Sequence, residues 1–451
     1  MIALLLGGGN WLFPLYRLVV EIAAVLVFAW FCMRSWRLPQ NLSTWVAGGL
    51  FVLAMLLLLV QLVPLSPSLW HSLPGRGLAL AVYTAVGAPD RAAPISLDPS
   101  ATRDTIAFFL VPIAAFVVAL RVGRMGQHRL LKVAAAFCLL NALLVIVQFQ
   151  GFAWLTPYSS YGRPGTGLFA NKNHCALFLV ATMPTVVWAI METQRRMTET
   201  SRRWAAVAVT GFLSLTVFGC LSRAGLALLP IGVAVSALVI APPTLRGRQA
   251  ALALGGFAVI ALLLVVVLPR TAVVAQALAR FDAQSDLRYQ FWPVVVEGIK
   301  TYFPIGSGFG TFRPVFAALE PLSIVKPTFV NNAHSDYLEI ALEGGAAGIA
   351  LILGFIAWFI ATAIARLWAC RRGDTGFTPI VIAVAGIAEL LLHSVVDYPL
   401  RTLALAAIAA IYCAILAMTP TALDLQKLNC YRGLNRRRTR TGTDRTARPG
   451  F

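Results

Sequence analysis

Charged residues are scarce in this sequence: only 12% of its 451 residues are Asp, Glu, Lys or Arg, and 59% are hydrophobic. Soluble domains carry about 25% charged residues, so the scarcity excludes an ordinary soluble globular protein. Apolar runs of about 17–25 residues recur along the chain, and each is long enough to cross the roughly 30 Å hydrocarbon layer of a membrane as a helix. The composition therefore predicts an all-α, polytopic integral membrane protein.

The sequence also lacks any fixed-period repeat or low-complexity linker, so we expect one integral membrane domain over residues 1–451. It should contain about 11–12 transmembrane helices. The predicted spans lie near residues 15–33, 45–64, 105–121, 131–151, 174–192, 204–221, 224–241, 250–268, 338–365, 378–395 and 402–419. Residues 2–13, which include Gly7-Gly8-Gly9, have two interpretations: a short extracytoplasmic or re-entrant lead-in, or part of a further span.

Cysteine is scarce as well, and none of the seven lies in residues 65–104 or 269–335, the two long polar segments. An odd number of cysteines scattered through the spans and their ends gives neither a disulfide framework nor the spacing of a zinc site. We interpret the cysteines as small core residues.

Basic residues outnumber acidic ones, giving a net charge of +19, but their placement argues against nucleic-acid binding. Most Lys and Arg residues fall in segments that share one side of the membrane when the predicted spans alternate. These segments are 34–44, 121–132, 193–203, 242–249, 366–377 and 420–451. The positive-inside rule makes that side cytoplasmic. We interpret the basic tail 420–451 as an orientation signal, with attraction to anionic lipid as the alternative.

The opposite, extracytoplasmic side then carries the polar segments in which chemistry can be placed, since ionisable groups are costly inside a bilayer. These segments are 65–104, 152–173, 222–223, 269–337 and 396–401. Closely spaced prolines exclude a long regular helix in the first segment.

The larger loop, residues 269–335, is predicted to be partly helical and to carry part of the active site. We expect a short helix over Ala272–Arg288, a tight turn at Pro304–Gly310 and irregular or partly helical structure over 311–330. The glycines of the turn could present backbone amides to an anion. The residue order of a nucleotide P-loop is absent, however, so a structural turn is the favoured interpretation.

Four basic side chains on this face form a candidate anion clamp: Arg163, Lys172, Arg223 and Arg288. Arg163 and Lys172 belong to a glycine-rich segment that also contains Asn173, and Arg223 occupies a sharp turn between two spans. The planar fork of arginine pairs with phosphate oxygens, which suits an anionic, lipid-linked substrate. A structural role is the alternative for each residue alone: Arg223 could cap the preceding helix and Lys172 could snorkel.

His334 is the candidate for proton transfer, because histidine exchanges protons near neutral pH without extreme tuning. Asp336, Glu339 and Glu343 follow it, and the two glutamates share one helix face, so their repulsion requires a nearby cation or polar acceptor. His334, Asp336 and Glu339 are also potential metal ligands. Their spacing matches no zinc site and the Asp-x-Asp pattern is absent, so we expect no metal.

Residues 393–401 combine ionisable and hydroxyl groups at the end of one span and the beginning of another. We expect His393 to pair with Asp397, and Asp397 with Arg401, which would make this segment structural. Glu389, inside the preceding span, requires a buried partner that the sequence does not identify.

In their order along the chain, these motifs resemble the O-antigen ligase and polymerase superfamily over roughly residues 150–400. The motifs are Arg163-Pro164-Gly165 with Asn171-Lys172-Asn173, Leu221-Ser222-Arg223-Ala224-Gly225, Arg288 with Trp292 and Pro304-Ile305-Gly306-Ser307-Gly308, and His334-Ser335-Asp336-Tyr337-Leu338 with Glu343-Gly344. Their order is more specific than any one of them. Members of the superfamily are polytopic bacterial inner-membrane glycosyltransferases that act at the periplasmic face.

The resemblance implies a reaction on glycans carried by undecaprenyl pyrophosphate, without a metal, nucleotide or other cofactor. It implies that Arg223 and Arg288 bind the donor pyrophosphate and that His334 is the base that activates the acceptor hydroxyl. The residues assigned to substrate binding are Arg163, Lys172, Asn173, Trp292 and Asp336. The family often shows twelve spans with both ends cytoplasmic, so this chain departs from its pattern around residues 1–14.

Two activities within the superfamily stay open: ligation onto a lipid A core or other surface glycan, and polymerisation of polysaccharide repeat units. The expected partners are the lipid-linked donor, the glycan or lipid A core acceptor and membrane lipids, with no nucleic acid. A membrane transporter is the alternative from another class. Transporters often have internally repeated halves and ionisable groups at the bilayer midplane, and this sequence has no such repeat and few such groups.

Overall fold

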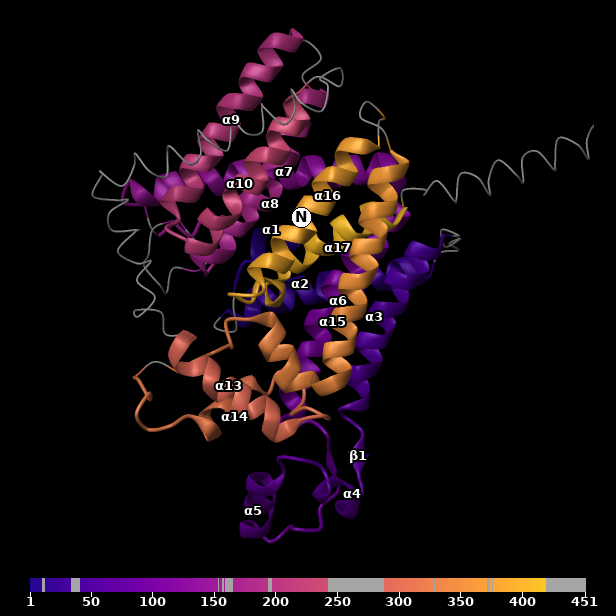
Figure 1. Ribbon diagram of the computed structural model, residues 1–451, viewed down its shortest axis with the longest axis vertical. Helices are drawn as coiled ribbons and strands as arrows, with labels where there is room; N and C mark the ends of the chain where they lie inside the picture. The colour runs from indigo at the N-terminus through magenta and orange to yellow at the C-terminus, as the bar shows by residue number, and fades with distance from the viewer. Residues whose placement is uncertain are drawn as a thin grey trace, which may run out of the picture.

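The computed structural model describes residues 1–9, 13–33, 41–152, 154–155, 158, 165–193, 197–241, 288–327, 329–370, 374 and 376–418, which are largely α-helical (Figure 1). The longer helices are α2 (Pro14–Cys32), α3 (Leu42–Val60), α6 (Pro99–Arg121), α7 (Gly123–Phe149), α8 (Lys172–Thr193), α9 (Glu199–Gly219), α10 (Arg223–Ile240), α15 (Asp336–Ala369), α16 (Phe377–His393) and α17 (Leu403–Met418). Seven of these helices are long and apolar enough to cross a membrane. The protein is an all-α polytopic membrane protein, as the sequence predicted.

A helix occupies each predicted span whose residues the structure describes. The apolar helices α16 and α17 are shorter than the other spans, with 17 and 16 residues. The predicted span near 250–268 and the basic tail 420–451 lie outside the described residues.

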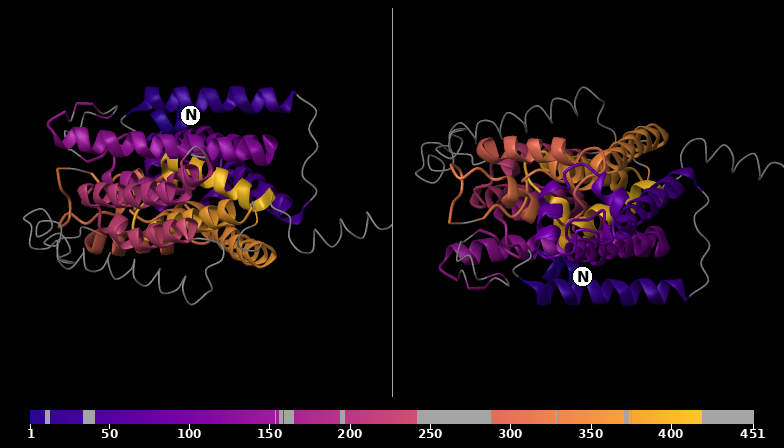
Figure 2. Two further views of the ribbon diagram at one scale, coloured as in Figure 1. Left: turned by 90° about the horizontal axis from the view of Figure 1, so that it is seen from above. Right: turned by 90° about the horizontal axis from the view of Figure 1, so that it is seen from below.

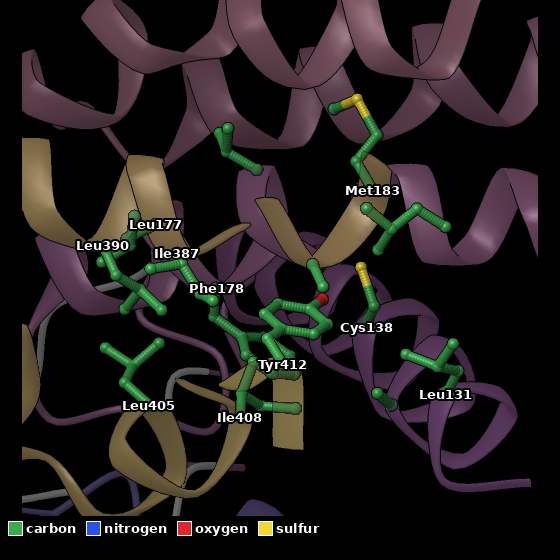
Figure 3. Packing of buried hydrophobic residues seen from close by; sticks show 14 of the residues in the cluster. Leu131, Cys138, Leu177, Phe178, Met183, Ile387, Leu390, Leu405, Ile408 and Tyr412 are labelled. Carbon is green, nitrogen blue, oxygen red and sulfur yellow. The ribbon is translucent and has the colours of Figure 1, made fainter. Parts of the chain in front are cut away.

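α8 and α17 form the centre of the bundle, whereas α2 lies at its edge, on the far side from α15 (Figure 2). Within the apolar 18-residue stretch of each helix, 83% of the residues are buried in α8 and 17% are buried in α2. α17 is apolar on all sides, as expected for a helix surrounded by others. Its Tyr412 lies among the apolar side chains of the core (Figure 3) and donates its hydroxyl hydrogen to the Ala181 carbonyl oxygen at 3.0 Å. The buried hydroxyl is therefore satisfied.

The described part of the N-terminal segment, residues 1–9, contains a short helix and a glycine turn. Helix α1 (Ile2–Leu6) has five residues, far too few to cross a bilayer. The glycines after it let the backbone approach its neighbours closely: Ala404 N donates to Gly7 O at 3.0 Å, and Ala170 N donates to Gly8 O at 2.9 Å. A Cβ atom on Gly8 would lie 2.0 Å from the Leu168 carbonyl oxygen. Residues 7–9 are thus packed against the beginning of α17 and the segment before α8, and both interpretations of residues 2–13 stay predictions.

The two predicted extracytoplasmic loops lie together at one end of the molecule, the lower end in Figure 1. Residues 65–104 contain the short helices α4 (Pro67–His71) and α5 (Gly77–Ala85), and strand β1 (Pro64–Leu65) pairs antiparallel with β2 (Ala93–Pro94). The prediction that this proline-rich segment excludes a long helix is confirmed up to Pro99, where α6 begins. The loops are joined directly, because Leu97 N donates to Ser307 O at 2.9 Å.

The larger loop is more helical than the sequence predicted. Helix α13 (Arg288–Tyr302) was not foreseen, and α14 (Phe312–Leu319) provides the predicted partial helix. The helix expected over Ala272–Arg288 lies, apart from Arg288, outside the described residues. Phe291, Val295 and Phe312 form part of a separate apolar cluster beneath the loop. The loop therefore has a small core of its own.

The glycine-rich turn between α13 and α14 is structural, which was the favoured interpretation. Its amides already have acceptors: Gly308 N donates to Glu343 O, Phe309 N to Gln61 Oε1 and Gly310 N to Glu343 Oε1, at 2.9–3.0 Å. Gly306 has a φ of 87°, a conformation that favours glycine. A Cβ atom there would lie 2.5 Å from Glu343 O. The turn is thus clamped onto α15, and these amides are not available to an anion.

Candidate active site

His334 lies at the centre of the polar end of the bundle, just before α15 begins. Its Nδ1 is 3.3 Å from Asp397 Oδ1, and its side chain is 28% exposed while that of Asp397 is fully buried. The backbone of His334 has a φ of 48°, a left-handed conformation that non-glycine residues rarely adopt and that is often found at functional sites. The next residue, Ser335, caps α15 by accepting from Leu338 N. The imidazole is thus held at one edge by a buried carboxylate and remains accessible.

Asp397 is surrounded by three imidazoles, not by the one that the sequence predicted. His393 Nε2 lies 3.7 Å from its carboxylate, which confirms the predicted pair, and His174 Nε2 lies 3.8 Å away. Asn173 Nδ2 donates to Asp397 Oδ2 at 2.7 Å. Burial favours the neutral acid, but the three imidazoles outweigh it and hold the pKa of Asp397 well below its usual range. The carboxylate is therefore a stable anion.

His174 is the residue that sequence reasoning missed. It is 2% exposed, and its Nδ1 lies 2.7 Å from Thr402 Oγ1. Its only sequence signal was its place directly after Asn171-Lys172-Asn173, at the beginning of a predicted span. Contact with Asp397 could not be inferred, because the two residues are far apart along the chain.

Aromatic side chains enclose the imidazole of His334. The ring of Tyr398 lies edge-on to it at a centroid distance of 5.0 Å, and that of Phe291 lies 5.9 Å away. Trp292, predicted to bind substrate, donates its indole N–H to Ala333 O at 2.8 Å. This contact fixes the backbone next to His334, so Trp292 positions the loop.

Arg288 begins helix α13 as the structure describes it, and its side chain is partly buried. It precedes Phe291 by three residues and Trp292 by four, and residues at these spacings share a helix face. That face is directed toward His334, because Phe291 contacts its ring and Trp292 binds its loop. The fold therefore places Arg288 on the His334 side of α13.

The first turn of α8 connects Asp397 to the turn that carries Arg223. Lys172 Nζ donates to Leu221 O at 3.1 Å, while the neighbouring Asn173 binds Asp397. Ser222 caps α10 by accepting from Gly225 N, which makes Arg223 the first residue of that helix. Lys172 thus binds a carbonyl oxygen just after α9. The sequence had suggested this capping role for Arg223. Arg163, the fourth predicted cation, lies outside the described residues.

A second ionic centre lies beside the first, and Arg401 holds it together. Its guanidinium contacts three carboxylates of α15: Glu343 at 2.7 Å, Glu339 at 3.2 Å and Asp336 at 3.8 Å. The cation that the sequence required near Glu339 and Glu343 is therefore present. The predicted pairing of Asp397 with Arg401 is not observed, because Arg401 is directed to α15 and Asp397 to the histidines. Opposite charges on α15 determine the direction of Arg401.

Asp336, predicted to bind substrate, is 2% exposed and is occupied by protein groups. Ser394 Oγ donates to its Oδ2 at 2.9 Å, and Leu400 N donates to the same oxygen at 3.3 Å. Asp336 N in turn donates to Asp397 O at 3.2 Å. These contacts tie the beginning of α15 to residues 394–400 and give Asp336 a positioning role.

Glu389 is fully buried in α16, one helical turn before His393. Neither of its carboxylate oxygens has a hydrogen-bond partner within the part of the chain that the structure describes. The buried partner that the sequence required is thus not identified there.

An apolar cavity of about 290 Å³ lies between α3, α6, α15 and α17. Its lining includes Phe51, Phe108, Leu351 and Phe355, and it extends at its polar end to Asp336 and Ser394. These two residues also border the polar end of the bundle. The cavity therefore extends from the membrane-spanning part of the fold to Asp336, two residues after His334.

Residues 206–353 match the family model described as O-antigen ligase. This part of the chain is therefore similar to the O-antigen ligase family. The match covers most of α9, then α10, α13, α14 and the first half of α15, and so includes Arg223, Arg288 and His334. Lys172, His174 and Asp397 lie outside it. A search of curated proteins found no match for the chain.

The match supports a protein of the O-antigen ligase or polymerase type, and the long apolar helices show a multi-pass membrane protein. The expectation that it needs no metal stays a prediction. Within the described residues, no group of three or more His, Cys, Asp or Glu side chains could hold a metal ion.

Proposed function

We propose that the protein is an O-antigen ligase that transfers a glycan from undecaprenyl pyrophosphate to a sugar hydroxyl of a lipid A core or other surface glycan. The reaction takes place at the periplasmic face of the inner membrane. The observation that carries this proposal is the pair formed by His334 and Asp397, in which a partly exposed imidazole contacts a buried carboxylate at 3.3 Å.

In this reaction His334 acts as the general base. We assign the hydrogen of the neutral imidazole to Nδ1, which lies 3.3 Å from Asp397 Oδ1, so that the lone pair on Nε2 accepts the proton of the acceptor hydroxyl. The acceptor oxygen then forms a bond to the anomeric carbon of the donor, and the bond from that carbon to the pyrophosphate oxygen breaks. Undecaprenyl pyrophosphate leaves with the electron pair. Asp397 holds the tautomer and stabilises the imidazolium that forms.

Arg288 and Arg223 bind the donor pyrophosphate on the two sides of this centre. Charge is already present on the leaving group, and positively charged side chains stabilise the additional charge that develops as the bond breaks. Arg223 is supported by the Lys172 contact to Leu221, and Arg288 by its position on the His334 side of α13. Arg163 completes the proposed set of cations, and Asn173 orients Asp397.

The apolar cavity supports a lipid-linked substrate. Its lining is almost wholly hydrocarbon, and its polar end lies at Asp336, two residues after His334. An isoprenoid or acyl chain in this cavity would keep its head group at the polar end of the bundle. Burial of such a chain is favourable by about 25 cal/mol per Å² of apolar surface.

The proposal is tested by replacing His334 with Ala in a strain that lacks the chromosomal copy and resolving the surface glycan by gel electrophoresis. We expect loss of the transferred glycan with normal levels of the membrane protein. Surface glycan that is unchanged would overturn the role of His334.

The same gel separates ligase from polymerase. Accumulation of lipid-linked polymer in the variant supports ligation, because the donor is made but not transferred. Single repeat units that remain attached to the acceptor, with the ladder lost, would instead identify a polymerase.

A further inference from the structure

Two buried cysteines lie in contact beside the candidate site. Cys175 Sγ is 3.7 Å from Cys220 Sγ, and the two residues are 0% and 2% exposed. Cys175 lies in the first turn of α8, directly after His174, and Cys220 is the C-terminal cap of α9. The sequence indicated no disulfide framework, because the two residues lie 45 positions apart in an odd-numbered set. Their proximity is a product of the tertiary fold.

The cysteine pair joins the same two segments as the Lys172 contact. Lys172 binds Leu221 O, and Leu221 has a φ of 51°, in the left-handed region where a non-glycine residue is strained. Arg223 follows two residues later. A covalent bond between Cys175 and Cys220 would therefore hold the strained turn, and Arg223 with it, against the first turn of α8.

We propose that Cys175 and Cys220 are a disulfide-forming pair that locks the Arg223 turn to α8. The inference rests on the proposed function, which places this end of the bundle in the periplasm. Disulfides persist in oxidising compartments such as the periplasm. The contact of 3.7 Å is longer than the S–S bond of about 2.05 Å. Closing it requires an approach of about 1.6–1.7 Å, which side-chain rotation and a small shift of the helix ends can supply.

The bond forms by two thiol–disulfide exchanges with an extracytoplasmic thiol–disulfide oxidoreductase. One cysteine thiolate attacks the disulfide of the oxidant and gives a mixed disulfide, and the second thiolate then displaces the sulfur of the oxidant. Two protons leave the cysteines, and two electrons reduce the oxidant to its dithiol. Because both thiols are buried in the folded bundle, the exchange belongs to folding, before α8 and α9 pack together.

Thiol trapping tests the proposal directly. Cells are quenched in acid, the protein is unfolded in detergent, and free thiols are alkylated with a maleimide before and after reduction. Of the seven cysteines, we expect two to be protected until reductant is added, and peptide mapping to recover Cys175 linked to Cys220. Labelling of both residues without reductant, or a link between other cysteines, would overturn the proposal.

Single-cysteine variants provide the matched comparison. Cys175→Ala should free Cys220 for labelling, and Cys220→Ala should free Cys175. Cys138, also buried but on α7, is the control, and Cys138→Ala should leave the cross-link intact. Loss of the cross-link in that control would contradict the assignment.

Thermal unfolding in detergent adds a second measurement. Reductant should lower the Tm of the wild type by several degrees, because the bond restricts the unfolded chain, and should not change that of Cys175→Ala/Cys220→Ala. An equal shift in both proteins would contradict a stabilising bond. Thiol counting needs no glycan transfer, so an active protein with free thiols overturns only this inference, and an inactive cross-linked protein only the proposed activity.

Discussion

Two ionic centres lie side by side at the polar end of the bundle, and they use opposite chemistry. At Asp397, one buried carboxylate is surrounded by three imidazoles, which can gain and lose protons. At Arg401, one guanidinium, which stays charged, faces three carboxylates on one side of α15. The first centre contains His334, a partly exposed imidazole, whereas the carboxylates of the second centre are buried.

This difference indicates that the Asp397 centre serves the reaction and that the Arg401 centre holds the fold together. The Arg401 centre also binds the amides of Gly310 and Phe312 through Glu343, and the amide of Ala333 through Glu339. It therefore joins the glycine turn and the His334 loop to the beginning of α15. We expect damage to this centre to reduce stability first and damage to the Asp397 centre to reduce activity first.

The largest effect on stability is expected for Arg401→Met. Removing the guanidinium leaves three buried carboxylates without their cation, and the loss of one partner of a buried ion pair costs about 3–5 kcal/mol. Thermal unfolding in detergent and the yield of folded protein measure the loss. Arg401→Lys keeps the charge and should lose less, and Glu343→Gln added to Arg401→Met should recover part of the loss. A Tm equal to that of the wild type would show that the Arg401 centre does not stabilise the fold.

Asp397→Asn should separate the two centres most clearly. The substitution keeps the shape of the side chain but removes the charge that orients His334 and stabilises its imidazolium, so kcat should fall by about 10²–10⁴. Glycan transfer to an added acceptor measures this, and substrate binding and Tm should change much less. A Tm loss as large as that of Arg401→Met, with kcat retained in the folded fraction, would assign both centres to architecture.

A smaller effect on donor use is expected for Lys172→Met. The substitution removes the contact to Leu221 O and one positive charge next to Arg223, and a hydrogen bond made by a charged group contributes about 1.5–3 kcal/mol. The KM for the lipid-linked donor should rise by about tenfold or more, with a smaller change in kcat. Lys300→Met, at an exposed position on α13, is the control. An unchanged KM would show that Lys172 caps the end of α9 and does not contribute to donor binding.

The smallest effect is expected for Trp292→Phe. The indole N–H bound to Ala333 O is lost while most of the ring packing is kept, at a cost of about 1 kcal/mol. Because the contact lies next to His334, kcat should fall by about fivefold. Trp204→Phe, an exposed tryptophan on α9, should show no change. If both variants behave alike, Trp292 does not position the His334 loop.

The helices could be predicted from the sequence because each depends on a local run of apolar residues. Run length located α2, α3, α8, α10 and α15 to within four residues at each end, whereas α6 and α7 begin six and eight residues before the predicted spans. Helix α13 was missed, because its apolar residues bury against α14 and the His334 loop, which are contacts that a local pattern does not contain. The length of α1 is a local feature of the sequence, whereas its position beside Ala404 depends on the tertiary fold.

In the candidate site, the sequence identified residue types better than it identified partners. His334 stood out as a proton acceptor, and the pair of His393 and Asp397 was accessible from helical spacing. The contacts of Asp397 with His174 and His334, and the direction of Arg401 toward α15, bring together segments that are far apart along the chain. Helical spacing relates only residues within one segment, so it could not predict these contacts.

The order of apolar and polar residues was enough to predict a bundle of membrane helices and its polar segments, because burial in lipid is set residue by residue. The fold alone decided which of these polar groups meet. Helix packing brought the first turn of α8, the beginning of α15 and the segment after α16 together at one end of the bundle. Buried charges there must find partners, and only the tertiary structure determines which partners are within reach.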